Sequence, residues 1–349
     1  MRTRRLGRTG LHVSEMCLGT LTFGHQADEA TSFQILDTAI ENGITFFDSA
    51  DVYPALAPPE LAGLSETILG RWLASRGGRD GLVIATKVFN RTGPRMNDAG
   101  LGRNHVIRAC EASLRRLQTN YIDLYQTHAF DPHVPLAETL RALDDLVHAG
   151  KVRYIGTSNL KAWQLADADW TSRQLSLPAF ASVQQRYNLL HRAIEDKIVP
   201  ACQSLGVAII LPWNPLAGGL LTGAYSNRQL PAGNRFDLPG SRGEMYRRRY
   251  LNEATLDEVD RIQEVAARHG HSLTDVALSW VASQPGISST LISADNPEQL
   301  REAIGSLAVV LSDEERDACD AAWFNLPRTR ELAIPSTDAF NLTVKAGAN

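Results

Sequence analysis

Eight short apolar runs, each followed by a longer segment, predict an α/β protein of the (β/α)8 TIM barrel class. All-helical and all-β chains do not alternate in this way. A doubly wound sheet is the rival architecture, but it calls for G-x-G-x-x-G after the first strand, where this chain reads LGTLTFG. We therefore favour the barrel. The predicted strands span residues 15–19, 44–48, 82–87, 121–128, 152–159, 180–185, 207–213 and 289–293.

The segments between the runs are predicted to be helices. They carry apolar residues at i, i+3 and i+4 and stop at a glycine or a polar residue, as at residues 27–43, 103–118 and 135–150. Gly7 and Gly10 precede the first run and indicate a short N-terminal hairpin. We predict a single domain over residues 1–349, with the barrel at about 15–311 and a C-terminal tail at about 323–349.

Composition and charge exclude several classes of partner. The 349 residues are 44% hydrophobic and 21% charged, which is ordinary for a globular protein. A formal net charge of −4 gives no support for binding to nucleic acid or to a membrane surface. The dense basic run at residues 246–250 is interpreted as a solvated helix face.

The four cysteines, Cys17, Cys110, Cys202 and Cys319, lie far apart in the sequence and form no CxxC pair. This spacing suggests neither a disulfide framework nor a zinc site, so no metal is expected. No run approaches the ~20 apolar residues that a membrane span needs. We therefore expect a soluble, cytoplasmic protein.

Polar and aromatic residues stand at the ends of six predicted strands. In a (β/α)8 barrel the chemistry lies at these carboxyl ends and in the loops that follow them. Each residue alone has a structural explanation, such as a surface lysine or a core tryptophan. Together on one rim they indicate a functional site, which Tyr53 can reach from the loop after the second strand. The strand-end residues are Asp48, Lys87, His128, Ser158, Asn159, Gln184 and Trp213.

The motifs around these residues resemble those of a known family. GTLTFG, FFDSADVY, IATK, YIDLYQTH, IGTSN, VQQRYN and PWNPLAGGLLTG occur in order between about residues 4 and 311. Together they resemble the aldo-keto reductases, in particular the branch of the voltage-gated potassium channel β-subunits. The resemblance implies an NAD(P)H-dependent carbonyl reductase with a catalytic tetrad of Asp48, Tyr53, Lys87 and His128.

The chemistry of carbonyl reduction explains these four residue types. Hydride delivered to a carbonyl carbon leaves negative charge on the oxygen, which needs a proton or a strong donor. Tyr53 supplies the proton, and the ammonium of Lys87 is expected to lower the pKa of the phenol from roughly 10. Asp48 is expected to hold the lysine in place and charged, and His128 is expected to donate to the carbonyl oxygen. The reverse oxidation of an alcohol uses the same groups.

The resemblance also implies a set of cofactor-binding residues. Trp213 stacks on the nicotinamide, and Ser158, Asn159 and Gln184 bind its carboxamide. The loop after Trp213 cradles the pyrophosphate through backbone N–H groups, and the start of the last barrel helix binds the adenosine. The full set is Thr20, Leu21, Gln26, Asp48, Ser158, Asn159, Gln184, Trp213, Asn214, Pro215, Leu216, Ala217, Gly218, Arg235, Ser293, Asp295, Gln299 and Glu302.

The resemblance implies NADP(H) as the favoured cofactor, with NAD(H) also usable. Arg235 matches an arginine that binds the 2′-phosphate of NADPH. Ala224 stands where the channel-like branch usually has a lysine, and Asp295 replaces a small polar residue. Both changes disfavour a phosphate dianion, so discrimination against NADH is expected to be weak.

The partner is expected to be a small-molecule carbonyl or alcohol. Phe89, Phe130 and Trp213 offer apolar walls with Asn90 and Arg91 nearby, which favours a ring-shaped or hydroxylated ketone over a charged acid. The long loops and the tail are expected to rim the mouth of the barrel. The oligomeric state stays open between a monomer and a homo-oligomer.

Two other functions are weighed. A nucleotide-bound regulatory or interaction subunit with little turnover is the alternative, but a subunit spared from turnover need not keep His128. An unrelated hydrolase or isomerase on a TIM barrel calls for a metal cluster or an acidic pair at the strand ends, which the sequence does not show.

Overall fold

The computed structural model describes residues 1–54, 58–225, 234–238 and 241–327. Parts of the loops after the second and seventh predicted strands, and most of the predicted C-terminal tail, lie outside these residues. The prediction of one domain over residues 1–349 therefore stays a prediction.

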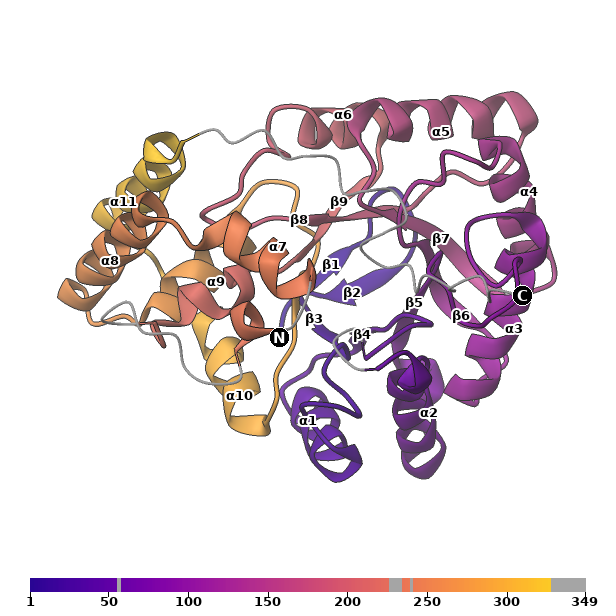
Figure 1. Cartoon of the computed structure of the whole chain (residues 1–349), viewed down its shortest axis with the longest axis horizontal. Coiled ribbons are helices and arrows are strands. Elements are labelled where there is room, and N and C mark those ends of the chain that lie inside the picture. Colours follow the sequence, from indigo (N-terminus) through magenta and orange to yellow (C-terminus); the bar gives the residue numbers. More distant parts are fainter. Residues whose placement is uncertain (55–57, 226–233, 239–240, 328–349) are drawn as a thin grey trace, which may run out of the picture.

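The described chain forms an eight-stranded parallel sheet in the order β10-β3-β4-β5-β6-β7-β8-β9. Its two outer strands, β9 and β10, are in contact, so the sheet closes into a barrel (Figure 1). All eight predicted strands are present, and the (β/α)8 prediction is confirmed. The strands are β3 (Met16–Gly19), β4 (Phe46–Asp48), β5 (Val83–Val88), β6 (Ile122–Thr127), β7 (Val152–Ser158), β8 (Ser182–Arg186), β9 (Ala208–Trp213) and β10 (Thr290–Ile292).

Helices surround the sheet, and the helices predicted at residues 27–43, 103–118 and 135–150 are present as α1, α3 and α4. Additional helices follow β9 and β10; α8 and α11 pack together at one side of the barrel (Figure 1). The helices are α1 (Glu29–Glu41), α2 (Leu64–Arg76), α3 (Arg103–Leu117), α4 (Leu136–His148), α5 (Ala162–Leu175), α6 (Ile198–Leu205), α7 (Ser241–Tyr250), α8 (Glu253–Arg268), α9 (Leu273–Ser283), α10 (Pro297–Ser306) and α11 (Asp313–Asn325).

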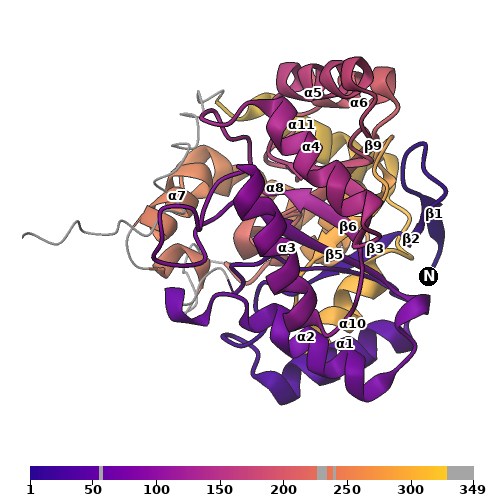
Figure 2. The same cartoon turned by 90° about the vertical axis from the view of Figure 1, so that its right-hand side faces the viewer.

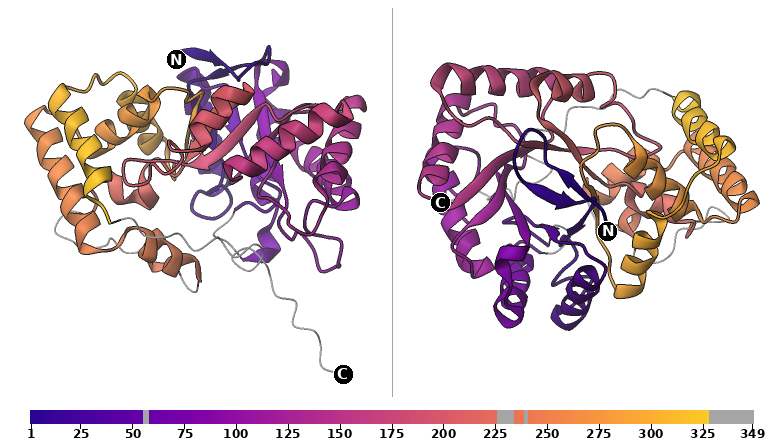
Figure 3. Two further views of the ribbon diagram at one scale, coloured as in Figure 1. Left: turned by 90° about the horizontal axis from the view of Figure 1, so that it is seen from above. Right: turned by 180° about the vertical axis from the view of Figure 1, so that it is seen from behind.

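The predicted N-terminal hairpin is formed by β1 (Thr3–Arg5) and β2 (His12–Ser14), which pair antiparallel. Leu6 and Val13 of this hairpin are fully buried and join the apolar cluster inside the barrel. The hairpin and α7 lie at opposite ends of the barrel (Figures 2 and 3). The hairpin therefore covers the end where the strands begin, and α7 lies at the end where they finish.

Alternation along the strands determines which side chains point into the barrel. Phe46, Ala85 and Leu124 belong to the inner apolar cluster. Because successive side chains of a strand point to opposite faces, residues two positions further on also point inward. Asp48 of β4 and Lys87 of β5 therefore lie inside, at the carboxyl end of the barrel.

The basic run at residues 246–250 lies in α7, as a helix face. Arg247 and Arg248 are exposed, but Tyr246 and Tyr250 are buried and Arg249 is partly buried, with its guanidinium carbon 6.0 Å from the ring centroid of Trp213, so the predicted solvated face is confirmed for only part of the run. All four cysteines are buried free thiols. Within the described residues no helix combines the length and the apolar character that crossing a membrane requires.

A buried ionic cluster lies outside the barrel, between α2, α3 and β5. Glu66 is fully buried, accepts a hydrogen bond from the hydroxyl of Thr86 at 2.5 Å and pairs with Arg116 at 2.7 Å. Asp51 is also buried, but neither of its carboxylate oxygens has a hydrogen-bond partner in the described part of the chain. Burial, and next the charge of Glu66, hold the pKa of Asp51 well above its usual range.

We expect Asp51→Asn to stabilise the protein at neutral and alkaline pH. Because burial raises the pKa of Asp51, the folded state holds this proton to higher pH than the unfolded chain, which ionises it above a pKa of about 3.9, so wild-type stability falls as the pH rises from that value towards the raised pKa. An amide does not ionise, so the free energy of unfolding should gain about 1.4 kcal/mol for each unit by which the native pKa of Asp51 exceeds the unfolded one, up to the pH of the measurement. Urea unfolding of both proteins at pH 5 and pH 8 measures the difference; a gain that does not grow with pH contradicts the assignment.

Candidate active site

The centre of the site is an ion pair between Lys87 and Asp48, both fully buried inside the barrel. The ammonium of Lys87 donates to a carboxylate oxygen of Asp48 and, at 2.8 Å, to the backbone carbonyl of Ser49. The other carboxylate oxygen accepts from the side-chain amides of Gln126 at 2.9 Å and Gln184 at 3.2 Å. Although burial opposes the charge of Lys87, Asp48 and Tyr53 outweigh it and raise the pKa of the lysine.

Tyr53 lies over this pair, in the loop that follows β4. Its backbone N–H donates to Ala50 at 3.0 Å, and only 7% of the residue is exposed. The ammonium nitrogen of Lys87 lies 5.0 Å from the centroid of the phenol ring. Burial raises the pKa of Tyr53 and the charge of Lys87 lowers it; burial is the larger effect, so the pKa is raised overall. The expected effect of Lys87 is present, but it does not bring the pKa below its ordinary value.

His128 follows β6 and faces the tyrosine. The two ring centroids are 6.0 Å apart, with the rings edge to face. Burial and the positive charge of Lys87 lower the pKa of His128 to about 3, so the imidazole is neutral at neutral pH. Nδ1 of the ring lies 3.1 Å from the side-chain amide nitrogen of Asn90. The four residues predicted as a tetrad are thus brought together.

The residues predicted to surround a nicotinamide form a connected hydrogen-bond network. The indole N–H of Trp213 donates to Asn159 at 3.2 Å, and the amide of Asn159 donates to the hydroxyl of Ser158 at 2.9 Å. Ser158 in turn donates to the backbone carbonyl of Gln184 at 3.0 Å. Trp213 is partly exposed, so a fixed aromatic face and adjacent polar groups stand at the mouth of the barrel. This arrangement fits a nicotinamide ring.

The loop predicted to cradle a pyrophosphate follows β9. Asn214 has a left-handed backbone, and its side chain accepts from the N–H of Gly218 at 2.5 Å. Gly218 itself has φ 75°, and an added Cβ would lie 2.9 Å from the ring of Tyr246. Glycine is therefore required on both steric and conformational grounds. Pro215 and Ala217 are buried and Leu216 is partly buried, so they contribute mainly backbone groups to this cradle.

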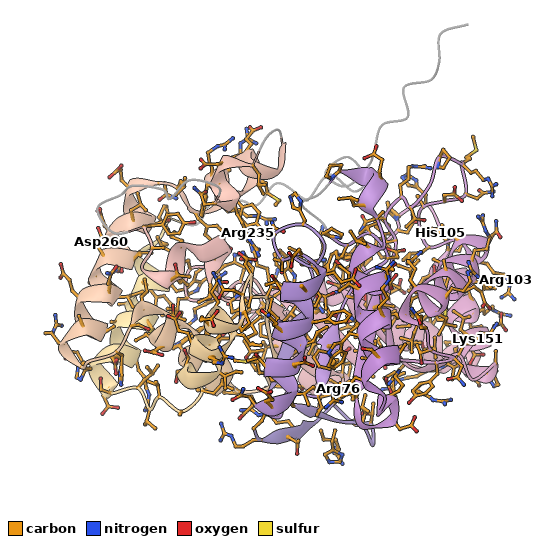
Figure 4. The ribbon with its side chains drawn as sticks, turned by 90° about the horizontal axis from the view of Figure 1, so that it is seen from below. Arg76, Arg103, His105, Lys151, Arg235 and Asp260 are labelled. Carbon is orange, nitrogen blue, oxygen red and sulfur yellow. The ribbon has the colours of Figure 1, made fainter. Side chains whose placement is uncertain are left out.

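The residues predicted to bind adenosine gather around η5 (Arg235–Asp237) and α10. Arg235 lies at the end of the molecule opposite the N-terminal hairpin (Figure 4). It is close enough to Asp295 for the charge of that carboxylate to act on its pKa. Gln299 accepts from the N–H of Asp295 at 2.9 Å, so it has a structural role in the turn before α10. Ser293 and Glu302 are exposed.

The three remaining residues of the predicted cofactor-binding set, Thr20, Leu21 and Gln26, differ in their environments. Thr20 is fully buried and donates to the hydroxyl of Ser49 at 2.9 Å, which fixes it against the end of β4. Leu21 is partly buried, and Gln26 is exposed in the following loop. Thr20 therefore lies beside Asp48, to whose backbone carbonyl its N–H also donates at 2.9 Å, whereas no contact in the described part of the chain joins Leu21 or Gln26 to the ion pair.

Two supports of the ion pair are not among the residues predicted from the sequence. Gln126 binds Asp48 from within β6, and Ser49 binds Lys87 through its backbone carbonyl. Strand alternation could have identified Gln126, because it lies two residues after the inward-facing Leu124. The contact of Ser49 involves the backbone, which no side-chain pattern reveals.

Comparisons with known proteins agree with this geometry. Residues 15–323 match the family model described as the aldo/keto reductase family. The uncharacterized oxidoreductase YrpG of Bacillus subtilis (strain 168) is 37% identical over 316 residues, which cover 88% of this chain and 92% of that protein. A probable voltage-gated potassium channel subunit beta of Oryza sativa subsp. japonica is 33% identical over 337 residues, covering 95% and 99%. A putative aryl-alcohol dehydrogenase of Schizosaccharomyces pombe is 32% identical over 358 residues, covering 94% and 97%.

The chain belongs to the aldo/keto reductase family. It is accordingly an NAD(P)H-dependent oxidoreductase that acts on carbonyl groups. The resemblance to the channel β-subunits is confirmed as well, since plant members of that group are among its relatives.

We expect Lys87→Met to move the pH profile of carbonyl reduction to higher pH. Lys87 lowers the pKa of Tyr53, so its loss leaves the phenol protonated over a wider range. The pH at which kcat falls should rise by about 1–3 units, the effect typical of one nearby opposite charge. Because the pKa of Tyr53 is already above its ordinary value, the wild type should begin to lose kcat only above about pH 10, whereas the variant should show no fall; steady-state rates between pH 8 and pH 11.5 compare the two.

A double variant, Asp48→Asn with Lys87→Met, controls for a buried carboxylate left without its partner. Asp48 raises the pKa of Tyr53 less than Lys87 lowers it, so the double variant should shift the profile in the same direction by less. Residual activity with an unshifted profile in both variants would argue against the coupling of Lys87 and Tyr53.

Proposed function

We propose that this protein reduces an aldehyde or a ketone to an alcohol, with Tyr53 as the proton donor and NADPH as the preferred source of hydride. The main support for this proposal is the position of Tyr53: its ring centroid lies 5.0 Å from the buried ammonium nitrogen of Lys87. A phenol beside a fixed positive charge is suited to protonate an oxygen on which negative charge develops.

Each member of the tetrad has a distinct role in this proposal. The bound nicotinamide supplies the hydride. Tyr53 gives its proton to the carbonyl oxygen, and Lys87 stabilises the phenolate that remains. Asp48 keeps Lys87 charged and in place, and the neutral His128 donates a hydrogen bond that orients the carbonyl. The same groups serve alcohol oxidation, so the cofactor ratio sets the direction.

The neighbourhood of Arg235 supports a weak preference between the two dinucleotides. A guanidinium binds the 2′-phosphate of NADPH, which favours NADP(H). The charge of Asp295 reaches the same guanidinium and competes with that phosphate, so NAD(H) remains usable.

The proposed substrate is a ring-shaped or hydroxylated ketone. Phe89 is buried, and Phe130 packs edge to face on Trp163 at a centroid distance of 5.9 Å. Phe89 and Phe130 follow β5 and β6, next to Asn90 and close to His128 in the chain, and would supply apolar surface near the site. The alternative of a regulatory subunit with little turnover is supported by the similarity to plant proteins named as probable potassium channel β-subunits. Because all four residues of the tetrad lie together, we favour an enzyme with turnover over a regulatory subunit.

The decisive experiment follows the oxidation of bound NADPH by stopped flow against aldehydes, sugar-like ketones and polycyclic ketones. Tyr53→Phe should lower the rate roughly 10² to 10⁴-fold, the usual contribution of general acid catalysis, and leave the Kd for NADPH nearly unchanged. Tyr121→Phe is the matched control, because its hydroxyl donates to Asp80 at an exposed position. Turnover of Tyr53→Phe within threefold of wild type would exclude the phenol as the proton donor. No oxidation of NADPH by any carbonyl would instead favour the regulatory subunit.

We expect Arg235→Ala to raise the KM for NADPH about tenfold or more, because a charge-assisted hydrogen bond to the 2′-phosphate is lost. The KM for NADH should hardly change, since NADH lacks that phosphate. Asp295→Ser should lower the KM for NADPH. Arg301→Ala, which removes an exposed guanidinium from α10, is the control. Equal effects of Arg235→Ala on both cofactors would refute the assignment.

A further inference from the structure

A side-chain amide contacts the histidine of the tetrad from the neighbouring loop. Asn90 follows β5 and is 5% exposed, and His128 follows β6. The amide nitrogen of Asn90 lies 3.1 Å from Nδ1 of His128. An amide nitrogen is a donor and has no acceptor capacity, so Nδ1 must accept this hydrogen bond.

This contact decides which ring nitrogen carries the proton. A neutral imidazole has one N–H and one bare nitrogen, and the hydrogen bond at one nitrogen fixes the state of the other. When Nδ1 accepts from Asn90, the proton sits on Nε2. The ring then presents a donor at Nε2, which is the state that a carbonyl oxygen needs. The opposite tautomer would present a lone pair there and repel that oxygen.

Backbone contacts hold both partners in place. The N–H of Gly100 donates to the carbonyl of Phe89 at 2.7 Å, which closes the loop that begins with Asn90. Asp131 accepts from the N–H of Leu101 at 2.8 Å and so ties this loop to the one that carries His128. The backbone carbonyl of His128 accepts from Asn159 at 2.9 Å. The contact of Asn90 with His128 therefore joins two braced loops.

We propose that Asn90 is a positioning residue that fixes His128 in the tautomer with the proton on Nε2. The role of that proton, donation to the substrate oxygen, rests on the proposed function. Asn90 itself touches neither the reacting atoms nor the proton that is transferred. It acts through the ring, by making only one of the two neutral forms favourable.

The charges that face His128 are compatible with this role. Lys87, from β5, disfavours an imidazolium, and Tyr53, from the loop after β4, is neutral below its raised pKa. Within the described residues the pKa of His128 carries no contribution from a carboxylate. An aspartate at position 90 would change both properties at once, since it offers acceptors to Nδ1 and attracts a proton to the ring.

The test measures the tautomer directly and then its effect on rate. Long-range proton–nitrogen correlation spectra of protein labelled with ¹⁵N-histidine report the protonation of each ring nitrogen, with His128→Gln identifying the signals. We expect wild type to show a bare Nδ1 and a protonated Nε2. Asn90→Asp should move the proton to Nδ1 or protonate both nitrogens, and it should lower kcat for carbonyl reduction about tenfold or more with a new dependence on pH.

Two further variants separate positioning from simple damage. Asn90→Ser keeps a hydroxyl that can donate and should retain the tautomer in part, whereas Asn90→Ala should give a mixture of the two. Asn120→Asp makes the same substitution at an exposed turn and should behave as wild type. A proton on Nδ1 in the wild type, or an unchanged tautomer and pH profile in Asn90→Asp, overturns the proposal. Because the spectra need no substrate, they decide this point even if no carbonyl is reduced.

Discussion

The ion pair of Lys87 and Asp48 is the interaction on which the site depends. An ammonium and a carboxylate each cost several kcal/mol to remove from water, and only close pairing with further hydrogen bonds offsets that cost. Here the pair receives support from Ser49, Gln126 and Gln184, so β4, β5, β6 and β8 all contribute. A slip of one residue in any of these strands would turn its contributing group outward and leave a buried charge without support.

Gln184 links this pair to the region that fits a nicotinamide. Its side chain donates to Asp48, and its backbone carbonyl accepts from Ser158. The network continues through Asn159 to Trp213, and Asn159 also binds the backbone of His128. Groups that would hold the cofactor and groups that would move the proton are therefore joined by direct hydrogen bonds. A change in one part of this network would shift the other.

The fold and the convergence of the strand-end residues could be predicted from the sequence, because strand alternation and parallel order together fix which side chains meet at one rim. Effects that depend on how side chains and loops pack could not be predicted from the sequence. Burial outweighs Lys87 in setting the pKa of Tyr53, and the depth of that phenol follows from how its loop packs. Gln299 accepts from a backbone N–H, and Ser49 accepts from Lys87 through its own backbone carbonyl; no side-chain pattern in the sequence reveals such contacts. That Asp51 is buried without a hydrogen-bond partner for its carboxylate, in the described part of the chain, also depends on how the helices pack on the barrel.

Hydrogen bonds at the two ends of the loop after β5 allow its exposed residues to change without moving the site. The bond from Gly100 to Phe89 and the bond from Leu101 to Asp131 hold the ends of this loop, whatever lies between them. Residues 94–97, which are exposed, can therefore vary in character while Asn90 and His128 stay in register. Substitutions at the rim could therefore change which carbonyl compound binds, while the buried residues and their chemistry stay the same.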